Sequence, residues 1–128
     1  MSTRILVVDD DPSILALVAE ILQDEGYEVA TARNGAEALA QVAEAVPAVL
    51  LTDLMMPVMD GPALVRACRA APVTAGLPIV VMSAVLPALL DGLAWLGVQD
   101  AIYKPFDMDV LVGIIARLAV GAWPAHGA

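Results

Sequence analysis

Five polar side chains follow short apolar runs in this sequence, a placement that suits chemistry at one edge of a sheet. They are Asp9, Asp10, Asp53, Ser83 and Lys104. A short apolar run closed by turn residues predicts a buried strand of a parallel sheet. Ligands of open α/β sheets bind in the crevice at the carboxyl ends of the strands. We therefore expect these five side chains to converge in such a crevice.

The three aspartates among them imply a metal ion. Carboxylates that share a small site raise each other's pKa unless a counter-charge is present. Oxygen ligands select a hard cation, and their small number favours Mg²⁺, which keeps several waters. A carboxylate can also act as a nucleophile that accepts a phosphoryl group. Transfer to Asp53 would need positioning and charge neutralisation, which Mg²⁺, Lys104 and the Ser83 hydroxyl can provide.

Strands and helices alternate along the chain, which indicates an α/β fold. Apolar runs predict strands at residues 5–8, 27–31, 49–51, 79–82 and 101–103, and caps and helical spacing predict helices that begin after Asp11, Asn34, Asp60, Leu86 and Asp107. Helices between strands require parallel pairing with right-handed crossovers. We expect a flavodoxin-like, doubly wound (βα)5 fold with a five-stranded parallel sheet of order 2-1-3-4-5.

Composition narrows the range of partners and compartments. The chain has 128 residues and a net charge of -9, so direct nucleic-acid binding and attachment to anionic membranes are not expected. Prolines break the uncharged run at residues 70–90, which argues against membrane insertion. The single cysteine, Cys68, fits a reducing cytoplasm. We expect one cytoplasmic domain over residues 1–120, a short flexible tail over 121–128 and no output domain, although the chain could be a domain excised from a larger regulator.

Four motifs together resemble the receiver domains of response regulators, the chemotaxis-type phosphoacceptors of two-component signalling. The motifs are Ile5-Leu6-Val7-Val8-Asp9-Asp10-Asp11-Pro12, Asp53-Leu54-Met55-Met56-Pro57-Val58-Met59-Asp60-Gly61, Val81-Met82-Ser83-Ala84 and Lys104-Pro105-Phe106. The resemblance extends from Arg4 to about Leu118. The motifs are specific jointly, whereas an Asp-Asp or Lys-Pro pair alone would be weak.

This resemblance assigns expected roles to the site residues. It implies that Asp53 takes a phosphoryl group from a sensor histidine kinase or a histidine phosphotransfer protein. Asp10 would bind Mg²⁺ directly and Asp9 through water, with Asp53 and the backbone carbonyl of Met55 as further ligands. Ser83 and Lys104 would contact the phosphoryl group, and the Lys104-Pro105 peptide bond would be cis. The protein would not be an enzyme in the ordinary sense, although it could catalyse its own phosphorylation and dephosphorylation.

The sequence departs from the resemblance where a signal would leave the site. Most receivers carry an aromatic switch residue three positions before the lysine, and Ala101 stands there instead. Tyr103 alternates to the other face of its strand and does not simply replace it. In the helix expected over residues 87–96, Trp95 lies opposite a leucine stripe. We hypothesise that this helix, the fifth strand and the last helix bind a partner or form a homodimer, with Trp95 as an anchor.

Simpler explanations remain open for single residues, and two other functions remain open for the whole. An acidic run such as residues 9–11 can be only a helix start, and Asp11 is interpreted mainly as a cap. The first alternative function is a pseudo-receiver that binds partners without phosphorylation, which Ala101 slightly favours. The second is a small Mg²⁺-dependent aspartyl-phosphate phosphatase of the haloacid-dehalogenase type. That class carries its nucleophile on the first strand, whereas Asp53 follows the third.

Overall fold

The computed structural model describes residues 3–84 and 97–120, and it has the expected architecture. The elements are β1 (Arg4–Val8), α1 (Pro12–Asp24), β2 (Glu28–Ala32), α2 (Gly35–Glu44), β3 (Val49–Asp53), α3 (Gly61–Ala70), β4 (Ile79–Ser83), β5 (Asp100–Tyr103) and α5 (Met108–Val120). The strands form one parallel sheet of order β2-β1-β3-β4-β5. This confirms the flavodoxin-like fold. The helix expected over residues 87–96, with Trp95, and the tail over 121–128 lie outside the described residues.

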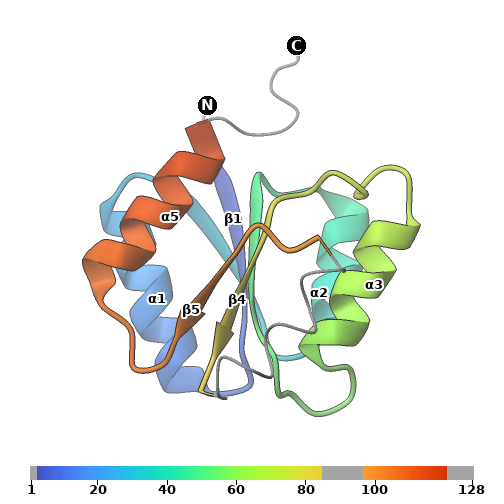
Figure 1. Cartoon of the computed structure of the whole chain (residues 1–128), viewed down its shortest axis with the longest axis horizontal. Helices are drawn as coiled ribbons and strands as arrows, with labels where there is room; N and C mark the ends of the chain where they lie inside the picture. Colours follow the sequence, from blue (N-terminus) through green and yellow to red (C-terminus); the bar gives the residue numbers. More distant parts are fainter. Residues whose placement is uncertain (1–2, 85–96, 121–128) are drawn as a thin grey trace.

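Two layers of helices cover the sheet, α1 and α5 on one face and α2 and α3 on the other (Figure 1). Each face has its own hydrophobic cluster, one that includes Leu22 and Ile115 and one that includes Val42 and Leu64. All five residues of β3 and all five of β4 are buried. Strands covered on both faces carry nearly continuous apolar runs, which explains why these two strands are recognisable in the sequence.

Polar caps begin the helices at the predicted residues. The Asp11 carboxylate accepts from the Ser13 backbone N–H at 2.8 Å, and the Asp107 carboxylate accepts from the Asp109 N–H at 2.7 Å. Such side chains satisfy backbone donors that the first turn leaves without partners. The caps at Asp11 and Asp107 are therefore confirmed. The strand expected at residues 27–31 lies one residue later, and no helix of the described residues is long and apolar enough to cross a membrane.

Arg69 on α3 connects the loop before β4 with the residues that lead into β5. Its guanidinium donates to the carbonyl oxygens of Thr74, Ala75 and Leu77 in the loop before β4. It also donates to the Gly97 carbonyl at 2.9 Å and to the Gln99 side chain at 3.3 Å. The planar fork of an arginine can serve several acceptors at once. Arg69 therefore fixes the start of the path into β5 against the end of α3.

Candidate functional site

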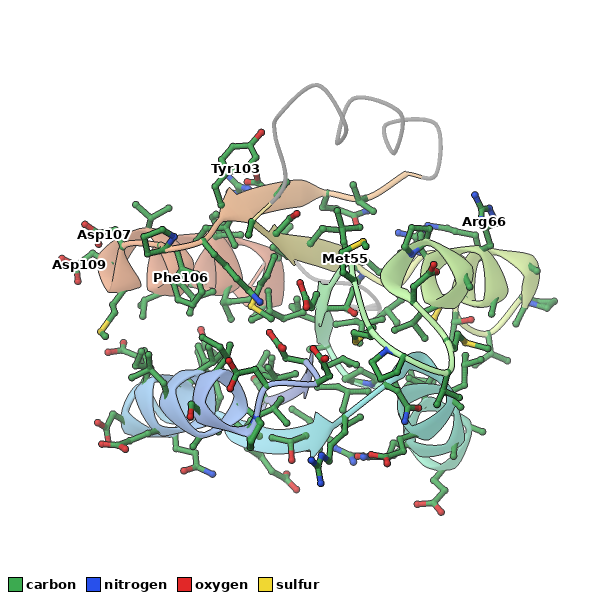
Figure 2. All side chains as sticks on the ribbon, turned by 90° about the horizontal axis from the view of Figure 1, so that it is seen from below. Met55, Arg66, Tyr103, Phe106, Asp107 and Asp109 are labelled. Carbon is green, nitrogen blue, oxygen red and sulfur yellow. The ribbon has the colours of Figure 1, made fainter. Side chains whose placement is uncertain are left out.

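The acidic side chains meet at the carboxyl-end edge of the sheet. Asp9 directly follows β1 and Asp53 ends β3. Asp9, Asp10 and Asp53 each offer one carboxylate oxygen, and these oxygens lie within 4.8 Å of one another. Asp9 is fully buried, Asp53 is 7% exposed and Asp10 is exposed. Figure 2 views the molecule from below, with Met55, the second residue after Asp53, near the centre.

Lys104 supplies the positive charge of the site. Its ammonium lies 2.8 Å from one oxygen of Asp9 and 3.4 Å from one oxygen of Asp53. Burial alone would lower the pKa of Lys104, but the hydrogen bond to Asp9 and the negative charges of Asp53 and Asp9 raise it. The ammonium therefore stays charged and joins the residues after β1 and β5 to the end of β3.

The Asp53 carboxylate is held in a setting that disfavours its charge. Burial raises the pKa of Asp53, and the neighbouring charge of Asp9 raises it further, while Lys104 and the Leu54 backbone N–H partly offset both effects. That N–H donates to one Asp53 oxygen at 2.9 Å. A carboxylate destabilised in this way is stabilised by a bound cation.

Ser83 ends β4 at the same edge and is almost completely buried. The residue before it, Met82, pairs in register with Asp53. The Ser83 carbonyl oxygen accepts from the Lys104 backbone N–H at 2.7 Å. The Lys104-Pro105 peptide bond that follows is cis, as expected. The strand ends therefore bring Ser83 and Lys104 to the edge that also carries Asp53.

Two glycines shape the loop between β3 and α3, and the sequence analysis did not assign them this role. Gly61 donates its N–H to the Leu54 carbonyl at 2.9 Å, and Gly35 donates to the Met59 carbonyl at 2.9 Å. Within this loop Val58 adopts a φ of 70°, which a β-branched residue rarely takes. A side chain at either glycine would meet this loop closely. The available signal was the pair Asp60-Gly61, from which the sequence analysis predicted only the start of a helix.

Ala101, at the expected switch position, and Tyr103 have different surroundings in β5. Ala101 packs against a small cluster of Leu54 and Val81, and Tyr103 is 44% exposed at the edge of the sheet. Tyr103 projects away from the sheet at the upper margin of Figure 2. Residues two apart in a strand lie on the same face, and the residue between them, Ile102, packs in the opposite cluster with Leu111. The expectation that Tyr103 turns to the other face from Ala101 is therefore wrong, and the two side chains differ in exposure instead. Trp95, the other residue of this hypothesis, lies outside the described residues.

Comparison with known proteins defines the class. The sequence model of the response regulator receiver domain matches residues 5–116. The chain is 42% identical over 119 residues to the transcriptional regulatory protein PrrA of Mycobacterium tuberculosis, which covers 91% of this chain and 48% of PrrA. It is 39% identical over 121 residues to the DNA-binding response regulator MtrA of Mycolicibacterium smegmatis, covering 92% of this chain and 51% of MtrA.

Solved structures agree with the sequence comparisons. The chemotaxis response regulator CheY4 of Vibrio cholerae superposes with a TM-score of 0.86 at 34% identity, covering 92% of this chain and 99% of CheY4. The receiver domain of a signal transduction histidine kinase from Syntrophus aciditrophicus superposes with a TM-score of 0.89 at 29% identity, covering 99% of this chain and 97% of that one.

The chain belongs to the response regulator receiver domain family, the phosphoacceptor modules of two-component signalling. Receiver domains are signalling modules rather than ordinary enzymes, and those of response regulators interact with histidine kinases. The chain spans about half the length of the curated relatives it matches. Because MtrA is a DNA-binding protein, the expected absence of nucleic-acid contact finds no support in these comparisons.

Gly61→Ala should destabilise the protein and disturb the phosphoacceptor. The new Cβ would lie 2.5 Å from the carbonyl oxygen of Asp53 and 2.9 Å from Cα of Leu54, both backbone atoms. We expect the free energy of unfolding to fall by about 1–3 kcal/mol in urea titrations, the usual cost of overpacking. Gly113→Ala is the matched control, because nothing lies within 4 Å of its Cβ and α5 should gain about 0.5–1 kcal/mol. Equal effects of the two changes would contradict the close approach at Gly61.

Asp53→Asn should stabilise the metal-free protein. The substitution removes a charge that burial and Asp9 disfavour, and the amide oxygen can still accept from the Leu54 N–H. We expect a gain of about 0.5–2 kcal/mol in the free energy of unfolding, measured in chelator-treated buffer. Glu20→Gln, at an exposed position of α1, changes the net charge equally and should have little effect. A loss of stability in Asp53→Asn would show that the Lys104 ion pair outweighs the burial of the charge.

Proposed function

We propose that Asp53 accepts a phosphoryl group from a phosphohistidine on a sensor histidine kinase or a histidine phosphotransfer protein. A carboxylate oxygen of Asp53 forms the new P–O bond, while the P–N bond breaks and leaves its electron pair on the imidazole nitrogen. The observation that carries the proposal is the burial of Asp53 beside Asp9 and within reach of the Lys104 ammonium. Such a transfer depends on positioning and charge neutralisation.

The donor set fits Mg²⁺. Three carboxylates offer oxygen ligands only, and one of them, Asp10, is exposed to solvent. Both oxygens of Asp9 already have partners, since Oδ1 accepts from the Asp11 N–H and Oδ2 from Lys104. This supports direct binding by Asp10 and contact through water by Asp9, with Asp53 and the Met55 carbonyl as the remaining ligands. When bound, Mg²⁺ would neutralise the carboxylates and the phosphoryl oxygens.

Lys104 and Ser83 are proposed to hold the transferred group. In the unphosphorylated protein the Lys104 ammonium lies closer to Asp9 than to Asp53. A phosphoryl group on Asp53 would place new anionic oxygens beside this ammonium, so that Lys104 shifts its contacts toward them. The Ser83 hydroxyl would donate to a further phosphoryl oxygen. Both residues would thereby respond to phosphorylation at the ends of neighbouring strands.

The proposed chemistry acts only on the protein itself. Besides the protein donor, the site would use small phosphodonors to phosphorylate itself, and it would later release the group by attack of water. The Met55 side chain is 69% exposed two residues after Asp53, where it can shield the phosphoryl group from water. We therefore propose slow self-hydrolysis. We also propose that the domain works in the cytoplasm, where sensor kinases present their phosphohistidine.

Two further functions fit the structure less well. A haloacid-dehalogenase-type phosphatase carries its nucleophile after the first strand. Here the proposed acceptor, Asp53, ends β3, while the Asp9 carboxylate after β1 is paired with Lys104 at 2.8 Å. A pseudo-receiver needs no acidic cluster. The close approach of Asp9, Asp10 and Asp53 costs electrostatic energy, which favours a domain that uses them.

Mass spectrometry after incubation with acetyl phosphate and Mg²⁺ tests the phosphoacceptor. We expect a gain equal to one phosphoryl group, absent in Asp53→Asn and after addition of a chelator. Asp109→Asn, an exposed acid of α5 away from Met55 in Figure 2, should keep the full gain. Lys104→Met should slow the reaction because it removes the cation beside Asp53. A wild-type protein that gains no mass from any donor would favour the pseudo-receiver.

We also propose that the face of β5 and α5 carries the outgoing contact, as part of the interface hypothesised with Trp95. Tyr103, Met108 and Val110 are 44%, 47% and 50% exposed there. Large apolar side chains exposed on neighbouring elements are candidates for contact with a partner.

Tyr103→Ser should weaken self-association or partner binding that beryllofluoride, a phosphoryl mimic, induces. Sedimentation with and without the mimic measures it. Val73→Ser provides the control, because Val73 is 68% exposed before β4 and outside this face. An unchanged sedimentation profile for Tyr103→Ser, in a protein whose wild type does associate, would remove β5 from the interface.

A further inference from the structure

A polar pocket adjoins the acidic cluster on the side of α2. It has a volume of about 330 Å³ and is lined by Asp10, Arg33, Asn34, Glu37 and Pro57. Its size lies at the lower end of the range for small-molecule sites. Because Asp10 belongs to both the pocket and the acidic cluster, a molecule in this pocket would lie next to the proposed metal site.

Most hydrogen-bonding groups at the start of α2 already have partners. The Asn34 side-chain oxygen accepts from the Glu37 N–H, and a Glu37 carboxylate oxygen accepts from the Arg33 backbone N–H, each at 2.9 Å. The Gly35 N–H donates to the Met59 carbonyl. The helix end itself therefore offers few donors to a ligand. Besides the carboxylates of Asp10 and Glu37, the polar groups that remain on the pocket wall are the Arg33 guanidinium and the Asn34 side-chain NH₂.

Arg33 differs from the other cations of the chain. Four of the other five engage carbonyl or carboxylate oxygens: Arg4, Arg69, Lys104 and Arg117. Within residues 3–84 and 97–120, no oxygen accepts a hydrogen bond from the Arg33 guanidinium. A guanidinium has five donors in a planar fork that matches phosphate and carboxylate oxygens. It is therefore available to an anionic ligand.

The charge around Asp53 makes such a cation useful. Three carboxylates repel an incoming dianion, and Lys104 is already paired with two of them. A cation at the mouth of an acidic site raises the local concentration of an anionic substrate. Arg33 is placed to do this beside Asp10, while Lys104 serves the inner end of the site.

We propose that Arg33, with the Asn34 side-chain amide, forms an anion subsite that binds a small dianionic acyl phosphate as it approaches Asp53. This proposal rests on the proposed function, since Asp53 is the acceptor. In the transfer the bond from phosphorus to the acyl oxygen breaks, and the carboxylate leaves with the electron pair. The new bond joins phosphorus to an Asp53 oxygen. Arg33 is a positioning and specificity residue that takes no part in the bond changes.

Phosphorylation kinetics with two donors test the subsite. Arg33→Gln should raise the apparent KM for acetyl phosphate, a dianion, by about threefold to fivefold, the upper part of the range for an exposed charge pair, with little change in the maximal rate. The rate with phosphoramidate, which carries less net negative charge, should change less. Arg66→Gln removes an exposed arginine of α3 that Figure 2 shows away from Met55, and it should behave as the wild type. Equal effects on both donors, or the same effect in Arg66→Gln, would overturn the subsite.

A binding experiment separates failure of the subsite from failure of the phosphoacceptor. In Asp53→Asn no transfer to residue 53 can occur, so acetyl phosphate with Mg²⁺ should bind without reaction. NMR titration should then shift the signals of Arg33 Nε and the Asn34 side-chain amide, and Arg33→Gln should abolish the Asn34 shift. If the wild type gains no phosphoryl mass but these shifts occur, the proposed function fails and the subsite stands. If phosphorylation occurs and the shifts do not, the subsite is wrong.

Discussion

The structure depends on holding three carboxylates close together at one edge of a parallel sheet, with the ammonium of Lys104 beside two of them. Asp9 and Asp53 are buried, and their charges oppose each other. The positive charge of Lys104 offsets this repulsion only in part. Its contacts with Asp9 and Asp53 raise the pKa of Lys104, but the pKa of Asp53 also stays raised. The folded protein therefore stores unfavourable charge repulsion at this edge. Binding a divalent cation would relieve it.

The sheet can sustain this arrangement because the rest of it is apolar and closely packed. The three central strands are covered on both faces by helices, and their ends are fixed by register rather than by the site itself. The loop after Asp53 is fastened separately, by Gly61 to the Leu54 carbonyl and by Gly35 to the Met59 carbonyl. A strained φ at Val58 is tolerated within that loop. Stability from the core thus offsets the cost of the site.

Much of the fold and of the acidic cluster could be predicted from the sequence, because the signals are local. Apolar runs mark β1, β3 and β4, caps mark the helix starts, and parallel topology then brings Asp9, Asp53 and Lys104 to one edge. The weakly alternating edge strand β2 was placed one residue early. The Arg69 contacts, the approach of Gly35 to Met59 and the pocket beside Arg33 were missed, because each joins segments distant in sequence and has no periodic pattern. The roles of the site residues came from the family resemblance and not from geometry.

The contacts of Arg69 constrain how a change at the site can leave it. At the site, the Lys104 backbone N–H donates to the Ser83 carbonyl and joins the ends of β4 and β5. Before β5, Arg69 donates to the Gly97 carbonyl, and the Gln99 side chain accepts from the Ile79 N–H at 2.6 Å. Ala101 of β5 packs against Leu54 and Val81 beside these contacts. The attachment of Gly97 and Gln99 to α3 therefore restrains the start of β5, and the described connection from Lys104 onward leads to α5.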